Sequence, residues 1–174
     1  MSEPIEIDVW QGEIAELEVD ALVVGANESL FMTAGAAASV KRHGGDAIER
    51  AAVDQGPIEP GRAVATTGGT LAASYVIHAV AVGHDRIADP QRLLAAVQSA
   101  LALCAPLQVH RIAVAPLGLE HGAFPVSEAA ELLVAALVAE APAHGLESIV
   151  IAAAHAAEAH AMADALARER ARVG

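Results

Sequence analysis

The chain has few aromatic residues, a single lysine and a single cysteine, and each shortage excludes something. Phe, Trp and Tyr make up 2% of its 174 residues, so the core must be built from Ala, Val, Leu and Ile. Few rings are left to stack on a nucleotide base. Cys104 stands in an apolar helical pattern, where we expect a buried small hydrophobic residue. A lone cysteine allows no disulfide within the chain.

Positive charge is also scarce. Ten Lys and Arg residues face 22 Asp and Glu residues, which gives a net charge of -12. Nucleic-acid affinity comes mainly from cationic side chains on phosphates, so we expect no nucleic-acid partner. No apolar run is long enough to span a bilayer, and the acidic N-terminus is not that of a signal peptide. We therefore expect a cytoplasmic protein with no membrane partner.

Hydrophobic residues make up 55% of the chain, which is enough for one domain covering residues 1–174. Predicted strands alternate with predicted helices, so we expect a largely parallel, mixed sheet between helical layers, an α/β/α fold. Asp46 is predicted to cap the second helix. The third and fourth strands are predicted to pair as a hairpin. The predicted strands are 5–10, 21–24, 63–67, 74–80, 111–115 and 148–153, and the later helices are 90–105, 126–140 and 155–172.

The stretch from residue 21 to residue 45 reads ALVVGANESLFMTAGAAASVKRHGG. An apolar run is followed by turn residues and then by an Ala-rich helical pattern, which predicts a buried strand, a loop and a helix. Ligands of open α/β sheets bind beyond the carboxyl ends of the strands. Gly35 at the helix entrance leaves room for a phosphate to approach backbone N–H groups.

A second loop has the same design. The predicted strand 111–115 runs into Gly118 to Pro125, and a helix follows. Backbone N–H groups in such a loop can hold an anion. We expect the two loops to lie at the carboxyl ends of adjacent parallel strands and to form one cleft for a diphosphate.

Both loops resemble those of the macrodomain (Appr-1"-p processing) family, whose members bind ADP-ribose. The first signature corresponds to Gly25-Ala26-Asn27 and to Met32-Thr33-Ala34-Gly35. The second resembles a bacterial and archaeal loop of the form Gly-Thr-Gly-x-Gly-Gly-Phe-Pro, which Gly118, Gly122, Phe124 and Pro125 match. The similarity extends over nearly the whole chain and implies the macrodomain fold, a mixed sheet between helical layers.

The resemblance also implies roles for single residues. Asn27 matches an asparagine that contacts the ribose next to the diphosphate, and Glu13 stands where many members have an aspartate that contacts the adenine amino group. Asn27 is the candidate catalytic residue, because it could help to position a water in hydrolytic members. No residue stands out as a general base. The implied ligand-binding set is Glu13, Ile14, Asn27, Thr33, Ala34, Gly35, Gly118, Leu119, Glu120, His121, Gly122 and Phe124.

Leu119, Glu120, His121 and Ala123 do not match the second family loop, and three departures from the family pattern bear directly on the ligand. Thr33 replaces a usual loop glycine, and Glu120 places a carboxylate inside the second phosphate loop, where His121 could offset it when protonated. Ala154 stands near the place of a common adenine-stacking aromatic, and His155 follows it. Thr33 could crowd a phosphate or donate its hydroxyl to it. Glu120 and the missing adenine platform favour an alternative: a degenerate macrodomain that has lost the ligand and serves as a protein-interaction or structural module.

Several of these residues also have a purely structural interpretation. Asn27 could simply close a strand as a turn residue, and Gly118 and Gly122 could mark a tight connection that needs positive φ. Phe124 could belong to the core or staple the next helix. His78 in a strand is typical of a hydrogen-bonded core histidine.

Two functions therefore follow from the sequence. The first is binding of ADP-ribose or a related nucleotide diphosphate, free or carried on a protein, with or without hydrolysis of ADP-ribosyl or O-acetyl-ADP-ribose esters. The second is the degenerate module. The eight histidines form no metal-binding motif, and we predict no metal centre and no cofactor.

Overall fold

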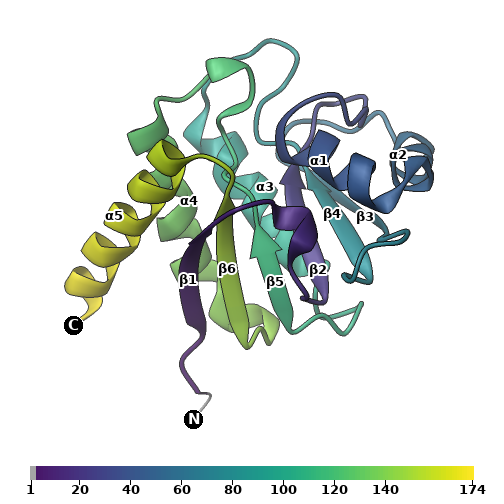
Figure 1. Ribbon diagram of the computed structural model, residues 1–174. Helices are drawn as coiled ribbons and strands as arrows, with labels where there is room; N and C mark the ends of the chain where they lie inside the picture. Colours follow the sequence, from purple (N-terminus) through teal and green to yellow (C-terminus); the bar gives the residue numbers. More distant parts are fainter. Residues whose placement is uncertain (1–2) are drawn as a thin grey trace.

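A computed structural model describes residues 3–174 as a six-stranded mixed sheet between two layers of helices (Figure 1). The strand order is β1-β6-β5-β2-β4-β3. The strands are β1 (Glu6–Gln11), β2 (Ala21–Gly25), β3 (Ala63–Thr67), β4 (Tyr75–Ala79), β5 (Arg111–Val114) and β6 (Ser148–Ala153). The helices are α1 (Gly35–Gly44), α2 (Asp46–Val53), α3 (Pro90–Ala102), α4 (Val126–Glu140) and α5 (Ala156–Val173), with short 3-10 turns η1 (Ile14–Glu16), η2 (Glu120–Gly122) and η3 (Ala141–His144).

The predicted α/β/α fold is confirmed, and so is the hairpin. All neighbouring strands run parallel except β3, which pairs antiparallel with β4 at one edge. β2 lies inside the sheet, and Ala21 to Val24 are all buried. A strand covered on both faces loses water from every side chain, which explains its uninterrupted apolar sequence.

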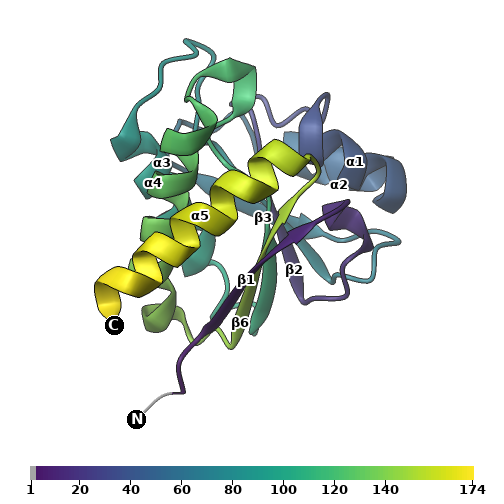
Figure 2. The ribbon, with the colours of Figure 1, turned by 60° about the vertical axis from the view of Figure 1, so that its left-hand side comes forward.

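Each face of the sheet carries its own apolar core. α3, α4 and α5 pack on one face, where Leu93, Leu133 and Met162 meet residues of the strands. α1, α2 and η1 cover part of the other face, around Leu22 and Val40. In Figure 2, α5 lies on the side of β1 and β6 that faces away from α1 and α2. Small alanine side chains on the helices let them approach the sheet closely.

The carboxyl ends of the five parallel strands share one edge of the sheet, which is the upper edge in Figure 1. The loops that follow β2, β4 and β5 all rise from this edge. No helix within residues 3–174 is long and apolar enough to cross a bilayer. Nor does this part of the chain gather three His, Cys, Asp or Glu side chains that could hold a metal ion.

His78 of β4 is a core histidine, as its place in a strand predicted. Its Nε2 lies 2.9 Å from the hydroxyl of Thr66, and that hydroxyl donates to the carbonyl of Thr67 at 3.1 Å. Nε2 therefore donates to Thr66, and Nδ1 is a buried acceptor with no partner within residues 3–174. Burial disfavours the charged ring and lowers the pKa of His78 to about 4.

Two local predictions were wrong. Asp46 is the first residue of α2, Gly45 precedes it at the cap position, and no side chain caps this helix. Gly45 takes a φ of 100°, so a glycine links α1 directly to α2 and leaves no room for a capping residue between them. α3 ends at Ala102 rather than at residue 105, because the amides of Leu103 and Cys104 donate to carbonyls three residues back, which tightens the chain into turns.

Candidate ligand-binding site

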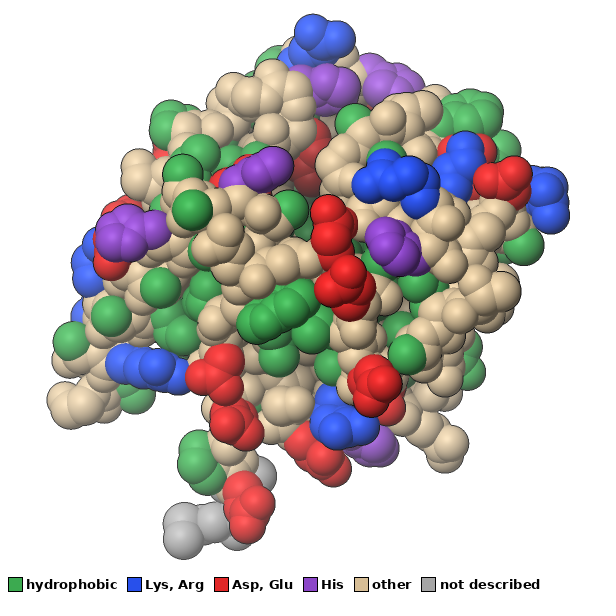
Figure 3. All heavy atoms as spheres, in the orientation of Figure 1, with side chains coloured by type: hydrophobic (Ala, Val, Ile, Leu, Met, Phe, Trp, Pro, Cys, Tyr) green, Lys and Arg blue, Asp and Glu red, His purple; other side chains and the backbone are tan. Residues whose placement is uncertain are grey.

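The two predicted loops meet. β2 and β5 are adjacent and parallel, with Val23 beside Val114, so the loops that leave them stand next to each other. Between them lies a cleft of about 700 Å³. Figure 3 shows a groove on this face, with acidic and histidine side chains along its margins. The volume falls within the range of small-molecule sites.

Nine of the twelve residues in the predicted set line this cleft. They come from three separate parts of the chain: the segment after β1, the loop after β2 and the loop after β5. They are Glu13, Ile14, Asn27, Thr33, Ala34, Gly35, Leu119, Glu120 and His121.

Gly118, Gly122 and Phe124 are not among the lining residues. Phe124 is only 3% exposed and belongs to the core, which agrees with its structural interpretation. Gly118 has a φ of 94°, and a side chain there would press on Leu93 and Phe124. Gly118 and Phe124 therefore support the second loop from beneath, whereas Gly122 is exposed, with a φ of 64° and open space beside it.

Several hydrogen bonds hold the first loop in place. The amide of Leu30 donates to the carbonyl of Asn27 at 3.0 Å. The backbone N–H of Met32 donates to Glu49 of α2 at 2.7 Å, and Lys41 donates to the same carboxylate at 2.9 Å. The Lys41 ammonium, followed by the Met32 amide, lowers the pKa of Glu49. Glu49 therefore anchors the loop as an ion, and α1 begins at Gly35 with its N-terminus at the cleft.

Asn27 presents an unused acceptor. Its Nδ2 donates to the carbonyl of Phe31 at 3.1 Å, which fixes the amide plane. Its Oδ1 is buried and has no partner within residues 3–174. A buried polar atom without a hydrogen-bond partner destabilises the folded protein. A ligand hydroxyl that donated to Oδ1 would therefore contribute more binding free energy than one that donated to an exposed acceptor.

We therefore expect Asn27→Ala to weaken ligand binding by about tenfold, which corresponds to ~1.4 kcal/mol. Calorimetric titration measures the affinity. Ser29→Ala is the matched control, because Ser29 belongs to the same loop but is not among the residues that line the cleft. An equal loss in both variants would show that the loop conformation, and not the Asn27 amide, is responsible.

The second loop holds Glu120 inside it. The carboxylate accepts the backbone N–H of Gly118 at 2.8 Å. It also lies against the end of β2, since a side chain at Gly25 would collide with it. Burial raises the pKa of Glu120, and hydrogen bonds from its own amide and that of Gly118 only partly oppose this.

The opposite end of the cleft lies near β1 and β6. Glu13 accepts a hydrogen bond from the hydroxyl of Ser39 on α1. Ala154 and His155 after β6 are exposed and line the same end. Within residues 3–174, no Phe, Tyr or Trp side chain lines this end, although the ring of Trp10 lies against Gly12, which does line it. Arg42 supplies a cation.

Sequence reasoning missed Ser39, Arg42 and Val82 as lining residues. Ser39 and Arg42 stand four and seven positions after Gly35, a spacing that puts all three on one face of α1. Val82 follows β4, the other neighbour of β2. The helical period could have found the first two, but Val82 required the strand order.

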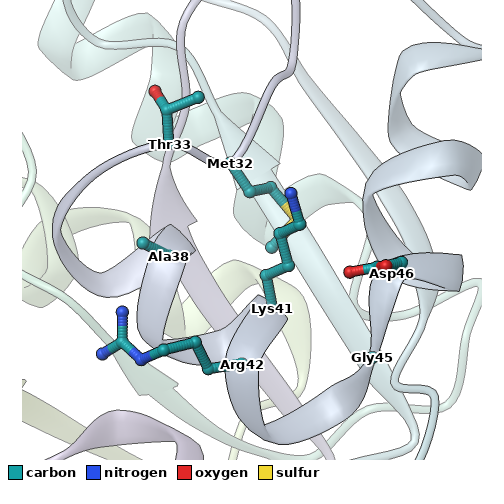
Figure 4. A pocket seen from close by; sticks show the side chains of 7 residues that line it. All are labelled: Met32, Thr33, Ala38, Lys41, Arg42, Gly45 and Asp46. Atoms are coloured by element: carbon teal, nitrogen blue, oxygen red, sulfur yellow. The ribbon is translucent and has the colours of Figure 1, made fainter.

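A shallower hollow of about 540 Å³ lies on the outer side of α1. Figure 4 shows Lys41 extending toward Met32 on that side, while Arg42 extends in a different direction. The hollow shares Thr33, Ala38 and Arg42 with the cleft. Neither the second loop nor the sheet edge contributes to its lining, so the cleft is the better candidate site.

Comparison with known proteins agrees with this geometry. The family model described as Macro domain matches residues 23–133, well over half of the chain. The chain belongs to the macro domain family. The match covers both loops of the cleft, the strands β4 and β5, and β2 from Val23 onward.

Individual macro domain relatives differ in length. An uncharacterised protein of Mycobacterium tuberculosis is 34% identical over 148 residues, which are 85% of this chain but only 41% of that protein. The chain thus spans about two-fifths of the length of the mycobacterial relatives that it matches. An O-acetyl-ADP-ribose deacetylase of Klebsiella pneumoniae is 34% identical over 142 residues, covering 78% of this chain and 81% of the enzyme.

Among solved structures, the Trypanosoma brucei macrodomain in complex with ADP-ribose has the same fold. The TM-score is 0.83 at 22% identity, over 91% of this chain and 68% of that one. At this identity the likeness establishes the fold alone.

Proposed function

We propose that this macro domain binds ADP-ribose in the cleft between its two loops. The observation that carries the proposal is the meeting of the loops after β2 and β5 at one edge of the sheet, with the N-terminus of α1 between them. Free N–H groups at a helix N-terminus and its dipole favour a bound anion. The relative named as an O-acetyl-ADP-ribose deacetylase supports the same ligand.

The length of the cleft suits a ligand with two end groups. Three strand spacings separate β1 from β2, or about 14 Å. Glu13 at one end would accept from the adenine amino group. Gly35 and the second loop would face the diphosphate, and Asn27 would accept from the ribose beyond it. The missing aromatic platform should lower the contribution of the base to affinity.

Titration calorimetry with ADP-ribose, ADP and AMP tests the proposal. We expect ADP-ribose to bind with a Kd in the range of about 1 to 100 μM, more tightly than ADP, because only ADP-ribose brings a ribose to Asn27. AMP should bind weakest, since it lacks the second phosphate. Absence of binding for all three at millimolar concentration would favour the degenerate interaction module.

A second candidate activity is hydrolysis of an ester on the ribose beyond the diphosphate. The deacetylase relative supports it. So does Phe31, which lines the cleft and is 51% exposed, because it leaves this end of the site open to an acyl group or to a protein that carries ADP-ribose. Release of ADP-ribose from O-acetyl-ADP-ribose, followed by chromatography, measures the activity.

A further inference from the structure

Glu120 is a carboxylate held in a fixed position inside the cleft. One oxygen, Oε2, accepts the N–H of Gly118 at 2.8 Å. The other oxygen, Oε1, is the atom that a side chain at Gly25 would meet first. The side chain therefore bridges the second loop and the end of β2, and it has little freedom to rotate away.

The neighbourhood of this carboxylate matches the end of the site assigned to the ester. Gly25 precedes Asn27 by two residues, and two extended residues span about 7 Å. The unpartnered Oδ1 of Asn27 and the carboxylate of Glu120 both line the cleft, and Glu120 lies against Gly25, two residues before Asn27. Together they offer two acceptors but no side-chain donor. Such a pair can bind and orient a water molecule or a ribose hydroxyl.

No cation pairs with Glu120 within residues 3–174, whose ion pairs all involve other acids. β2, which packs against Glu120, presents only Gly25 there. The charged or titratable side chains that line the cleft around it come from its own loop and from three other segments: His121, Glu13, Arg42, His155 and Glu158. Burial raises its pKa, which makes the ionised form a stronger proton acceptor than an exposed glutamate.

We propose that Glu120 is the general base for ester hydrolysis in this cleft, acting on a water molecule that it shares with Asn27. The inference rests on the proposed function. Glu120 takes one proton from the water as the water oxygen bonds to the ester carbonyl carbon. The tetrahedral intermediate then collapses, the bond to the ribose oxygen breaks, and the proton on Glu120 passes to that oxygen. ADP-ribose and the free acid leave, and Glu120 is again ionised.

The Glu120→Gln variant separates this role from a structural one. Glutamine keeps an oxygen that can accept the Gly118 amide, so the loop should stay closed, but it accepts no proton. We expect the turnover of O-acetyl-ADP-ribose to fall at least 100-fold. Affinity for ADP-ribose should stay unchanged or tighten by up to about tenfold, because a negative charge near the diphosphate is removed. Glu128→Gln, which removes an exposed charge on α4 outside the cleft, should turn over like the wild type.

The pH profile is the second measurement, and it needs no variant. The base must be ionised, so turnover should rise with pH through the pKa of Glu120, at a higher pH than an ordinary glutamate would require. If Glu120 had only a structural role, turnover would not rise with pH in this way. Turnover that is flat between pH 4 and pH 8, or equal turnover in wild type and Glu120→Gln, would overturn the proposal. Binding of ADP-ribose without any hydrolysis would overturn it too, while leaving the proposed binding function intact.

Discussion

Replacing Gly35 with valine should weaken ADP-ribose binding at least 100-fold, or about 2.8 kcal/mol, without unfolding the domain. Gly35 opens α1, is exposed and lines the cleft. An added Cβ would meet nothing within 4 Å, so the space beside Gly35 is free for a ligand and valine would fill it. The φ of 59° also disfavours a branched side chain, which costs about 1 to 2 kcal/mol of stability.

Gly145→Val is the matched control for that backbone strain. Gly145 has a φ of 69°, and its added Cβ would also meet nothing within 4 Å. It follows η3 and precedes β6, so it lies at the opposite edge of the sheet from the cleft. Both variants should lose similar amounts of thermal stability, and only Gly35→Val should lose affinity by calorimetry. If Gly35→Val bound ADP-ribose with wild-type affinity, Gly35 would not be part of the binding site.

The stability of the domain should fall steeply as the pH drops from about 6.5 to about 4, because of His78. The ring is neutral in the folded protein, with a pKa of about 4, whereas in the unfolded chain it titrates near 6.5. Between these values the unfolded chain binds more protons, so acid favours unfolding. The difference of about 2.5 between the two pKa values corresponds to about 3 kcal/mol in the free energy of unfolding. This contribution is fully present above pH 6.5 and is lost as the pH approaches 4.

His78→Gln should flatten this part of the stability curve, because glutamine can still donate to Thr66 but does not titrate. Urea unfolding at a series of pH values measures the difference. His160→Gln is the control, since His160 is an exposed residue of α5 and its loss should leave the slope unchanged. Burial of Glu120 acts in the opposite direction, stabilising the folded state at low pH, but it contributes equally to both variants. If the free energy of unfolding changed with pH equally in His78→Gln and wild type, the assignment of this pH dependence to His78 would be wrong.

Most of the fold was predictable from local patterns. An apolar run bounded by turn residues identified β2, and the helical period identified α4 from residue 126 to residue 140. The errors occurred where neighbouring elements compete for the same residues. Asp46 has the chemistry of a helix cap, but the glycine link between α1 and α2 leaves it inside the helix.

The candidate site was predictable in part, for the same reason. Loop glycines and Asn27 were visible in the sequence, because an αL turn or a close backbone approach demands particular residues. Val82 was not, since a valine also suits an ordinary apolar core, and Arg42 could be found only through its helical spacing from Gly35. Glu120 was visible as a departure from the family pattern, but its contacts with Gly118 and Gly25 were not.

The sequence by itself determined the alternation of strands and helices, the two glycine-bearing loops and the family resemblance, because these follow from periodicity and from the conformational demands of single residues. Only the tertiary structure decided which strands are neighbours and where each loop side chain lies. Strand order brings the loops after β2 and β5 together across about 90 residues of chain. It also places the half-buried Glu120 against β2, and this position is what turns an unexpected carboxylate into a candidate base.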